Sequence, residues 1–134
     1  MKKINNNGLL SIQINSNNEI TVIFGPVNGT VWMNRNELPE LFGCYMTDID
    51  QCIGEIFKKN MLRVEDTCKY HIIAGGRRIS YDITAVNLTV IITLAFRLAT
   101  PEAKVLRIWF IEQLTKLQSF DVMFPDIGEN FRLN

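Results

Sequence analysis

The sequence predicts an α+β fold with a small N-terminal antiparallel sheet, a helix-turn-helix, a β-hairpin wing and two C-terminal helices. Residues 9–14 and 67–83 alternate apolar and polar side chains, as half-buried strands do. Residues 49–57 instead repeat apolar residues at spacings of three and four, which is typical of a helix. The apolar runs between residues 88 and 118 are too long for single strands, so we expect helices there as well.

The composition of the 134-residue chain, 47% apolar and 21% charged, suits one compact domain with a core of its own. Fourteen basic and fourteen acidic side chains give a formal net charge of zero. No overall field therefore attracts the protein to nucleic acid or to an anionic membrane. Any contact with DNA has to come from a local basic patch.

Several function classes find no support in the sequence. Three cysteines, Cys44, Cys52 and Cys68, form no CxxC pair, and His71 is the single histidine, so neither a disulfide framework nor a zinc site is favoured. No spacing suggests a catalytic set. The most apolar run, Leu88 to Phe96, is shorter than the roughly 20 residues that cross a bilayer. We expect a soluble cytoplasmic protein that is no enzyme and has no cofactor, metal, membrane contact or small-molecule substrate.

The N-terminal third reads as strands and turns after a flexible lead at residues 1–7. Leu9–Ile14 and Ile20–Phe24 flank the turn residues Asn15–Asn18, which predicts a hairpin. A second turn at Pro26–Gly29 leads into a short strand, Thr30–Met33, which we expect to complete the small N-terminal sheet.

Two short helices around a tight turn follow. Asn34 is placed to cap the first, with Glu37 three residues on as in a capping box, and Gly43 ends it. Thr47 is the expected cap of the second, with Asp50 three residues later. Its apolar face consists of Ile49, Cys52, Ile53, Ile56 and Phe57.

A second predicted hairpin, the wing, joins Thr67–Ile73 to Arg78–Ile83 through a flexible basic tip, Ala74–Arg77. One face would carry Cys68, Tyr70, Ile72, Ile79, Tyr81 and Ile83, and the other Lys69, His71, Arg78, Ser80 and Asp82.

Two helices are expected next, with Thr100 capping the second and Pro101 in its first turn. This last helix, about Pro101 to Gln118, is apolar almost all the way round and needs cover on two sides. Residues 119–134 are too apolar for a solvated tail, so we expect them to pack on the domain, residues 8–118, or on a second copy.

A family resemblance rests on specific residues. Thr30-Val-Trp-Met-Asn-Arg-Asn-Glu-Leu-Pro-Glu-Leu-Phe-Gly43 resembles the opening of the RhuM-type virulence-associated family. Ile53–Phe57, Met61-Leu62, Asn87-Leu88, Ile91-Ile92 and Arg107–Trp109 keep that family's order and spacing, so the resemblance covers about Thr30 to Trp109. Pro101–Trp109 is also similar to the end of the Bro-N domain of phage antirepressors, a DNA-binding module.

The predicted order of strand, helix-turn-helix, glycine-tipped hairpin and helices resembles a winged helix-turn-helix domain. The family resemblances imply that it binds double-stranded DNA or acts in DNA-associated transcription regulation, in a phage or mobile element of bacteria. They assign no catalytic residue to the region. The chain departs from the family at Pro39, where a small alanine is usual. It also departs at Met46–Gln51, where the second helix commonly starts with polar or basic residues.

Eight residues are the candidate DNA contacts: Tyr45, Thr47 and Gln51 on the helix, and Lys58, Lys59, Lys69, Arg77 and Arg78 for phosphates. The six basic residues, with Arg63 included, would form one patch if helix and wing lie side by side. Some residues of this region also have a purely structural explanation. Tyr45 is weighed slightly toward the core, Lys58 and Lys59 suit a helix C-terminus, and Asp48 and Asp50 suit a helix N-terminus.

The competing hypothesis keeps the fold and drops the nucleic acid. A protein-interaction or homodimerisation module would use its apolar last helix and tail, which fits the neutral net charge and the acidic start of the second helix. The basic wing tip and the family resemblance favour DNA.

Overall fold

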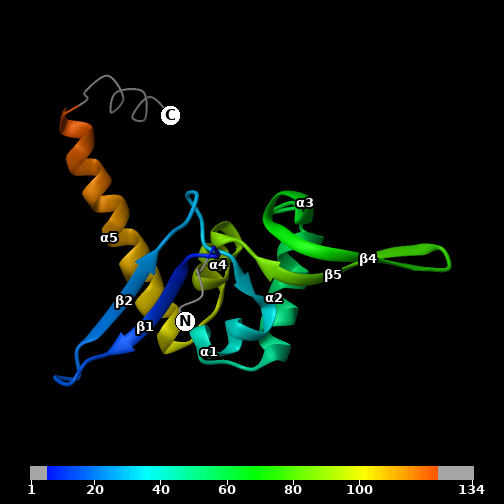
Figure 1. The fold of residues 1–134 in the computed structure, drawn as a ribbon, viewed down its shortest axis with the longest axis horizontal. Coiled ribbons are helices and arrows are strands. Elements are labelled where there is room, and N and C mark those ends of the chain that lie inside the picture. The colour runs from blue at the N-terminus through cyan, green and yellow to red at the C-terminus, as the bar shows by residue number, and fades with distance from the viewer. Residues whose placement is uncertain (1–5, 124–134) are drawn as a thin grey trace.

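The computed structural model describes residues 6–123, and the side chains of residues 6–117. Its α+β fold agrees with the sequence prediction. Along the chain the elements are β1 (Leu9–Ile14), β2 (Ile20–Gly25), β3 (Met33–Asn34), the 3-10 turn η1 (Arg35–Glu37), α1 (Leu38–Phe42), α2 (Met46–Lys58), α3 (Val64–Thr67), β4 (Cys68–Gly75), β5 (Arg78–Val86), α4 (Leu88–Arg97) and α5 (Pro101–Met123). Figure 1 shows helices at the centre, with the β1–β2 hairpin and α5 on one side and the β4–β5 hairpin on the other.

The N-terminal hairpin forms as predicted, with β1 and β2 antiparallel and Leu10 opposite Phe24. Its turn depends on Asn15, whose side-chain oxygen accepts from the backbone N–H groups of Asn17 and Glu19, both at 2.9 Å. Asn18 adopts a positive φ of 60°, a conformation that asparagine tolerates better than most residues. The side-chain chemistry of the turn therefore closes the hairpin.

The expected third strand, Thr30–Met33, is wrong in position and in partner. A turn with φ of 54° at Asn28 and 78° at Gly29, closed by a bridge between Val27 and Thr30, takes the chain away from β2. The strand that follows, β3, pairs instead with the end of β5, Met33 opposite Val86, in a sheet of order β3-β5-β4. The root of the second hairpin is thereby tied to the start of the helical region.

The first helix of the pair ends as predicted at Gly43, whereas the predicted contact between Asn34 and Glu37 forms at the 3-10 turn η1, before α1 begins at Leu38. The backbone N–H of Asn34 donates to Glu37 Oε1 at 3.0 Å, and Gly43 ends α1 in the left-handed conformation, φ 61°. The predicted cap of the second helix is wrong. Thr47 already lies inside α2, whose extended N-cap residue is Tyr45, and the Tyr45 N–H faces Asp48 Oδ2 at 3.4 Å.

A short helix, α3, occupies Val64–Thr67, where no element was predicted and where Thr67 was expected to start a strand. Glu65 and Asp66 fall in its first turn, which suits the helix dipole. Thr67 Oγ1 donates to the Arg63 carbonyl at 2.7 Å, so the strand begins one residue later, at Cys68.

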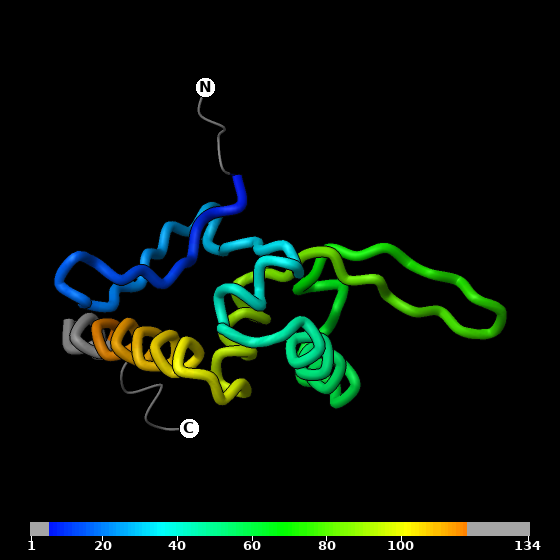
Figure 2. Tube along the Cα trace, turned by 90° about the horizontal axis from the view of Figure 1, so that it is seen from below, coloured from blue at the N-terminus to red at the C-terminus, as the bar shows by residue number. Residues whose placement is uncertain are grey.

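The central core joins α1, α2, α4 and the first half of α5, which lie together at the middle of the molecule in Figures 1 and 2. The predicted apolar face of α2 is confirmed, because Ile49, Cys52, Ile53 and Ile56 are buried and Phe57 packs against the core. The side chains with no exposed surface include Leu38, Phe42, Ile49, Ile56, Val86, Val90, Ile91, Leu94, Ala103 and Leu106.

The junction between α4 and α5 is held by two polar side chains. The predicted cap of α5 is confirmed, since Thr100 Oγ1 accepts from the Ala103 N–H at 3.1 Å. Arg107 Nη1 donates to the carbonyls of Ala95 and Leu98, both at 2.7 Å, and so satisfies backbone groups that the end of α4 leaves open.

Helix α5 continues to Met123, beyond the expected end at Gln118. The predicted tail at residues 119–134 lies largely outside the described residues. Among the described helices, none is long and apolar enough to cross a membrane.

Two glycines give a matched test of backbone constraint. A Cβ at Gly43 would overlap the Glu102 carboxylate, and the positive φ disfavours any L side chain. We expect Gly43→Ala to lower the free energy of unfolding by about 1–2 kcal/mol. Gly54, on α2, has open space around the same position, so Gly54→Ala should raise stability by about 0.5–1 kcal/mol. Urea unfolding of both variants measures the two effects, and equal shifts would contradict the assignment.

Candidate nucleic-acid interface

The wing, defined as the β4–β5 hairpin, projects from the helical body as a two-stranded arm (Figures 1 and 2). Gly75 pairs with Arg78, which leaves Gly76 and Arg77 as the turn, and Gly76 takes the positive φ of 61° that such a turn requires. Every residue from 71 to 82 is exposed. At about 3.3 Å per residue, the tip stands about 20 Å beyond Lys69 at the root.

The predicted faces of the wing are confirmed beyond a bulge between Lys69 and Tyr70. The pairs Tyr70–Ile83, Ile72–Tyr81 and Ala74–Ile79 alternate with His71–Asp82, Ile73–Ser80 and Gly75–Arg78. Residues in successive pairs point to opposite sides of a ribbon. We call Tyr70, Ile72, Ala74, Ile79, Tyr81 and Ile83 the apolar wing face.

The two arginines at the tip, Arg77 and Arg78, are exposed, and within the described residues no ion pair involves either of them. Their charges therefore stand uncompensated at the far end of the arm. Among the predicted DNA contacts, these two arginines form the most accessible positively charged site.

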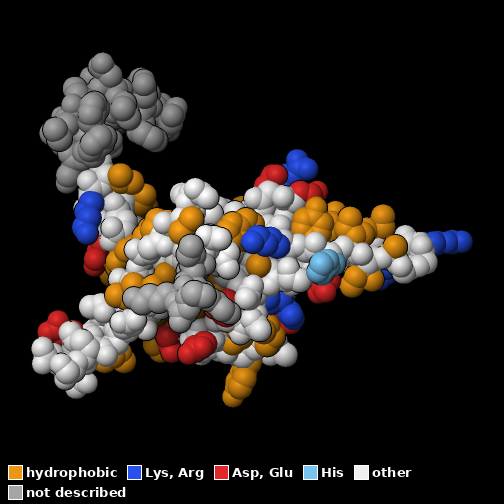
Figure 3. All heavy atoms as spheres, in the orientation of Figure 1, with side chains coloured by type: hydrophobic (Ala, Val, Ile, Leu, Met, Phe, Trp, Pro, Cys, Tyr) orange, Lys and Arg blue, Asp and Glu red, His pale blue; other side chains and the backbone are white. Residues whose placement is uncertain are grey.

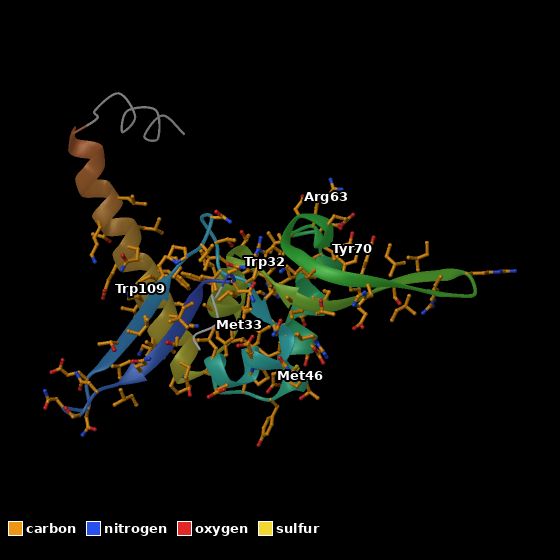
Figure 4. All side chains as sticks on the ribbon, viewed as in Figure 1. Trp32, Met33, Met46, Arg63, Tyr70 and Trp109 are labelled. Atoms are coloured by element: carbon orange, nitrogen blue, oxygen red, sulfur yellow. The ribbon has the colours of Figure 1, made fainter. Side chains whose placement is uncertain are left out.

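The other predicted phosphate contacts lie closer to the body. Lys69 Nζ sits 4.8 Å from the centre of the Trp32 ring, a cation–π contact at the wing root, where Figure 4 labels Trp32. Lys58 and Lys59 are exposed at the C-terminal end of α2. The tip is a separate positive site, because the length of the arm carries it away from these lysines.

Arg63, the sixth basic residue, is partly balanced by its neighbours Glu65, at 3.7 Å, and Asp66, at 3.8 Å. The structure does not show the single basic patch that was expected if the helix and the wing lay side by side. The basic residues divide instead between the wing tip and the body.

The exposed face of α2 carries the predicted contacts Thr47 and Gln51 among acidic side chains. Asp50 is held by Arg35, which donates from Nε at 2.8 Å and from Nη2 at 2.6 Å. The hydrogen bond to Asp50 is the main cause that raises the pKa of Arg35. The interpretation of Asp50 as a helix cap is therefore wrong.

A similar pair involves Glu55, whose Oε2 accepts from Arg97 Nη2 at 2.9 Å. Asp48 remains at the helix start, where the dipole favours it. Two of the three acidic groups on this face of α2 are therefore matched by an arginine.

Tyr45 does not cover the core. Its side chain is 80% exposed at the start of α2, so the weighting toward a core role is wrong. Nothing in the described residues packs it away from solvent, and it is free to contact a partner that approaches this end of the helix.

A shallow hollow of ≈ 380 Å³ lies between α2 and the α4–α5 junction, lined by Gln51, Cys52, Arg97 and neighbouring residues. Burial raises the pKa of the Cys44, Cys52 and Cys68 thiols, so they stay protonated at neutral pH. Within the part of the chain that the structure describes, no cluster of three or more His, Cys, Asp or Glu could hold a metal ion.

Arg97, Arg107 and Trp109 make separate contacts and form no common cluster. Arg97 pairs with Glu55, and Arg107 caps α4. Trp109 makes an edge-to-face contact with Phe24 at 5.2 Å, which docks the N-terminal hairpin on α5, and a second one with Phe110 at 5.5 Å within the helix. All three are structural, in separate places.

Sequence reasoning missed two features of this surface. The first is the exposure of Ile72, Ile79 and Tyr81, which arises because β4 and β5, at eight and nine residues, are longer than one small core can cover. The pairing of Arg35 with Asp50 joins residues 15 apart on different elements and left no signal in the sequence.

Comparisons with protein-family models, with curated proteins and with solved structures found no match. The α+β fold and the surface geometry therefore stand as the basis for any functional assignment.

Exposure of Tyr45 gives a direct test. Because Tyr45 is 80% exposed, Tyr45→Ala should change the free energy of unfolding by less than about 0.5 kcal/mol. Phe42→Ala, three residues earlier and fully buried, should cost about 3–5 kcal/mol. Chemical denaturation of both variants is the measurement, and a large loss for Tyr45→Ala would contradict its position.

Proposed function

We propose that this chain is a DNA-binding regulatory module that contacts the phosphate backbone through the tip of its wing. The observation that carries the proposal is the placement of Arg77 and Arg78, exposed and without ion pairs in the described region, at the end of a free-standing arm. Arginine pairs well with phosphate, because its planar guanidinium offers several donors in a fixed geometry.

The body supplies secondary contacts in this proposal. Lys58, Lys59 and Lys69 lie nearer the helices and would approach phosphates flanking the site reached by the tip. Thr47 and Gln51 are the polar, uncharged groups on the exposed face of α2, and Tyr45 projects at its start. The resemblance to RhuM-type and Bro-N proteins supports a regulatory role in a phage or mobile element.

The salt dependence of binding tests the phosphate contacts. Each phosphate neutralised contributes about 0.9 to the slope of log affinity against log salt concentration. Arg77→Ala/Arg78→Ala should therefore reduce the slope by roughly 2 and weaken binding to a mixed-sequence duplex. Fluorescence anisotropy at a series of salt concentrations measures both quantities.

The matched control removes two exposed lysines from α5, Lys104→Ala/Lys116→Ala, with the same loss of charge. Its slope should stay near that of the unaltered protein. Equal effects of the two double variants would show that net charge alone governs binding, and unaltered protein that binds without any salt dependence would overturn the proposal.

A second candidate, a homodimerisation or protein-interaction module that no longer binds DNA, is favoured by the surface of α5. Ala103, Leu106 and Phe110 form a buried stripe, and the same face continues to Leu114 and Leu117, which are 61% and 59% exposed. In Figure 1, α5 crosses β2 and then diverges from it, so the second half of the helix leaves the body.

A second copy of α5 would cover that stripe. The residues that flank Leu114 on the helix, Gln113 and Thr115, are uncharged, so two identical helices would meet there without like-charge repulsion. Partner binding through this face and DNA binding through the wing use different surfaces.

Mass measurement in solution tests the second candidate. If α5 pairs with itself, the unaltered protein is a dimer and Leu114→Gln/Leu117→Gln is a monomer, because the apolar stripe is interrupted without a loss of helix propensity. Lys104→Ala/Lys116→Ala should remain dimeric. A monomeric unaltered protein at every concentration tested would contradict self-association.

A further inference from the structure

The apolar wing face leaves large side chains in water far from the core. Ile72, Ile79 and Tyr81 are 62%, 71% and 44% exposed. Toward the root the face is better covered, where Tyr70 and Ile83 are half-buried and the Tyr70 and Tyr81 rings meet edge to face at 5.0 Å. Figure 3 shows orange side chains along the arm as far as the blue tip. A two-stranded ribbon with such a face gains from a partner that buries it.

The charges on the wing indicate what kind of partner fits. The six residues of the apolar wing face are uncharged. Arg77 lies in the turn at the tip, and Arg78, whose pair with Gly75 belongs to the opposite face, stands directly before Ile79. Asp82, the acidic residue of the arm, lies on the opposite face, paired with His71. The complementary surface is therefore apolar with anionic groups beside it.

The minor groove of duplex DNA has this combination, because sugar C–H groups line its walls and phosphates line its rims. Its width of about 6 Å in B-form DNA is too small for a ribbon whose two strands alone lie about 4.8 Å apart before side chains are added. A wing can enter only if the groove opens. Proteins open it by inserting an apolar side chain between base pairs, which bends the duplex by about 20–90°.

The major groove is wide enough for an undistorted ribbon, about 12 Å, but apart from the thymine methyl groups it presents hydrogen-bond donors and acceptors to the bound face. Isoleucine side chains satisfy none of these groups. The chemistry of the apolar wing face therefore favours the minor groove over the major groove.

We propose that the wing enters the minor groove and that Ile79, the most exposed apolar residue beside the tip arginines, inserts between two base pairs and bends the DNA. This inference rests on the proposed function, since it requires the tip arginines to bring the wing to a duplex. Flexible pyrimidine–purine steps such as TA are the sites where insertion is easiest.

The experiment uses the full 134-residue chain and a duplex of about three helical turns with a central TA step and a fluorophore at each end. Energy transfer between the fluorophores reports bending, and anisotropy reports binding separately. We expect the unaltered protein to raise energy transfer on binding. Ile79→Thr, which keeps the strand propensity of a β-branched residue, should remove that rise while the affinity falls by less than about tenfold.

Two further variants keep the test specific. Ile73→Thr changes an isoleucine one pair further from the turn on the opposite face, 52% exposed, and should bend DNA like the unaltered protein. Ile79→Leu replaces the wedge by another apolar side chain and should retain bending. Circular dichroism confirms that each variant is folded.

The possible results separate a failure of the Ile79 wedge from a failure of the proposed function. Binding without bending by the unaltered protein, unchanged bending by Ile79→Thr, or loss of bending in Ile73→Thr overturns the wedge and leaves the proposed phosphate contacts standing. A duplex that the unaltered protein does not bind at all overturns the proposed function and the wedge with it, and indicates that the apolar wing face serves a protein partner.

Discussion

The structure depends on one central core in which α1, α2, α4 and the start of α5 bury their apolar faces against each other. Leu38, Phe42, Ile49, Ile91 and Leu106 have no exposed surface there. The left-handed turn at Gly43 makes this arrangement possible, because it reverses the chain between α1 and α2 in the space beside Glu102. A chain of this length has a single core, so whatever lies beyond its reach stays in solvent.

Both surfaces with a proposed role are consequences of that limit. The wing is attached at its root, where β3 and the Lys69–Trp32 contact hold it, and it runs outward from there. The second half of α5 leaves the core after Phe110 in the same way. Strands and helices longer than the core they serve present their far ends to other molecules.

Local sequence patterns predicted most helices and strands, but they did not predict which distant residues pair with each other. The Asn34–Glu37 contact, the helix end at Gly43 and the Thr100 cap each involve residues close together in the sequence. They were therefore predictable from residue type and spacing. The wrong cap at Thr47 illustrates the limit. Thr47 and Asp50 have the right spacing, but Asp48 is closer to the helix start and Asp50 is taken by Arg35 from another element.

The partner of a strand is equally hard to predict from local signals. Thr30–Met33 reads as the next strand of the N-terminal sheet, because consecutive strands usually pair. Positive φ at Asn28 and Gly29 redirected the chain, and β3 joined β5 more than fifty residues later. The exposed position of Tyr45 depends on how α1, α2 and α5 pack together, which residue spacing does not encode.

The acidic side chains on α2 and the neutral net charge do not conflict with phosphate binding at the wing tip. At physiological ionic strength the Debye length is about 8 Å, so exposed charges further apart than this barely influence each other. The tip stands about 20 Å beyond the wing root, more than two such lengths from the body. Asp50 and Glu55 are also matched by Arg35 and Arg97. A phosphate that approaches Arg77 and Arg78 therefore experiences a local positive site, and the length of the arm is what separates that site from the charges on the helices.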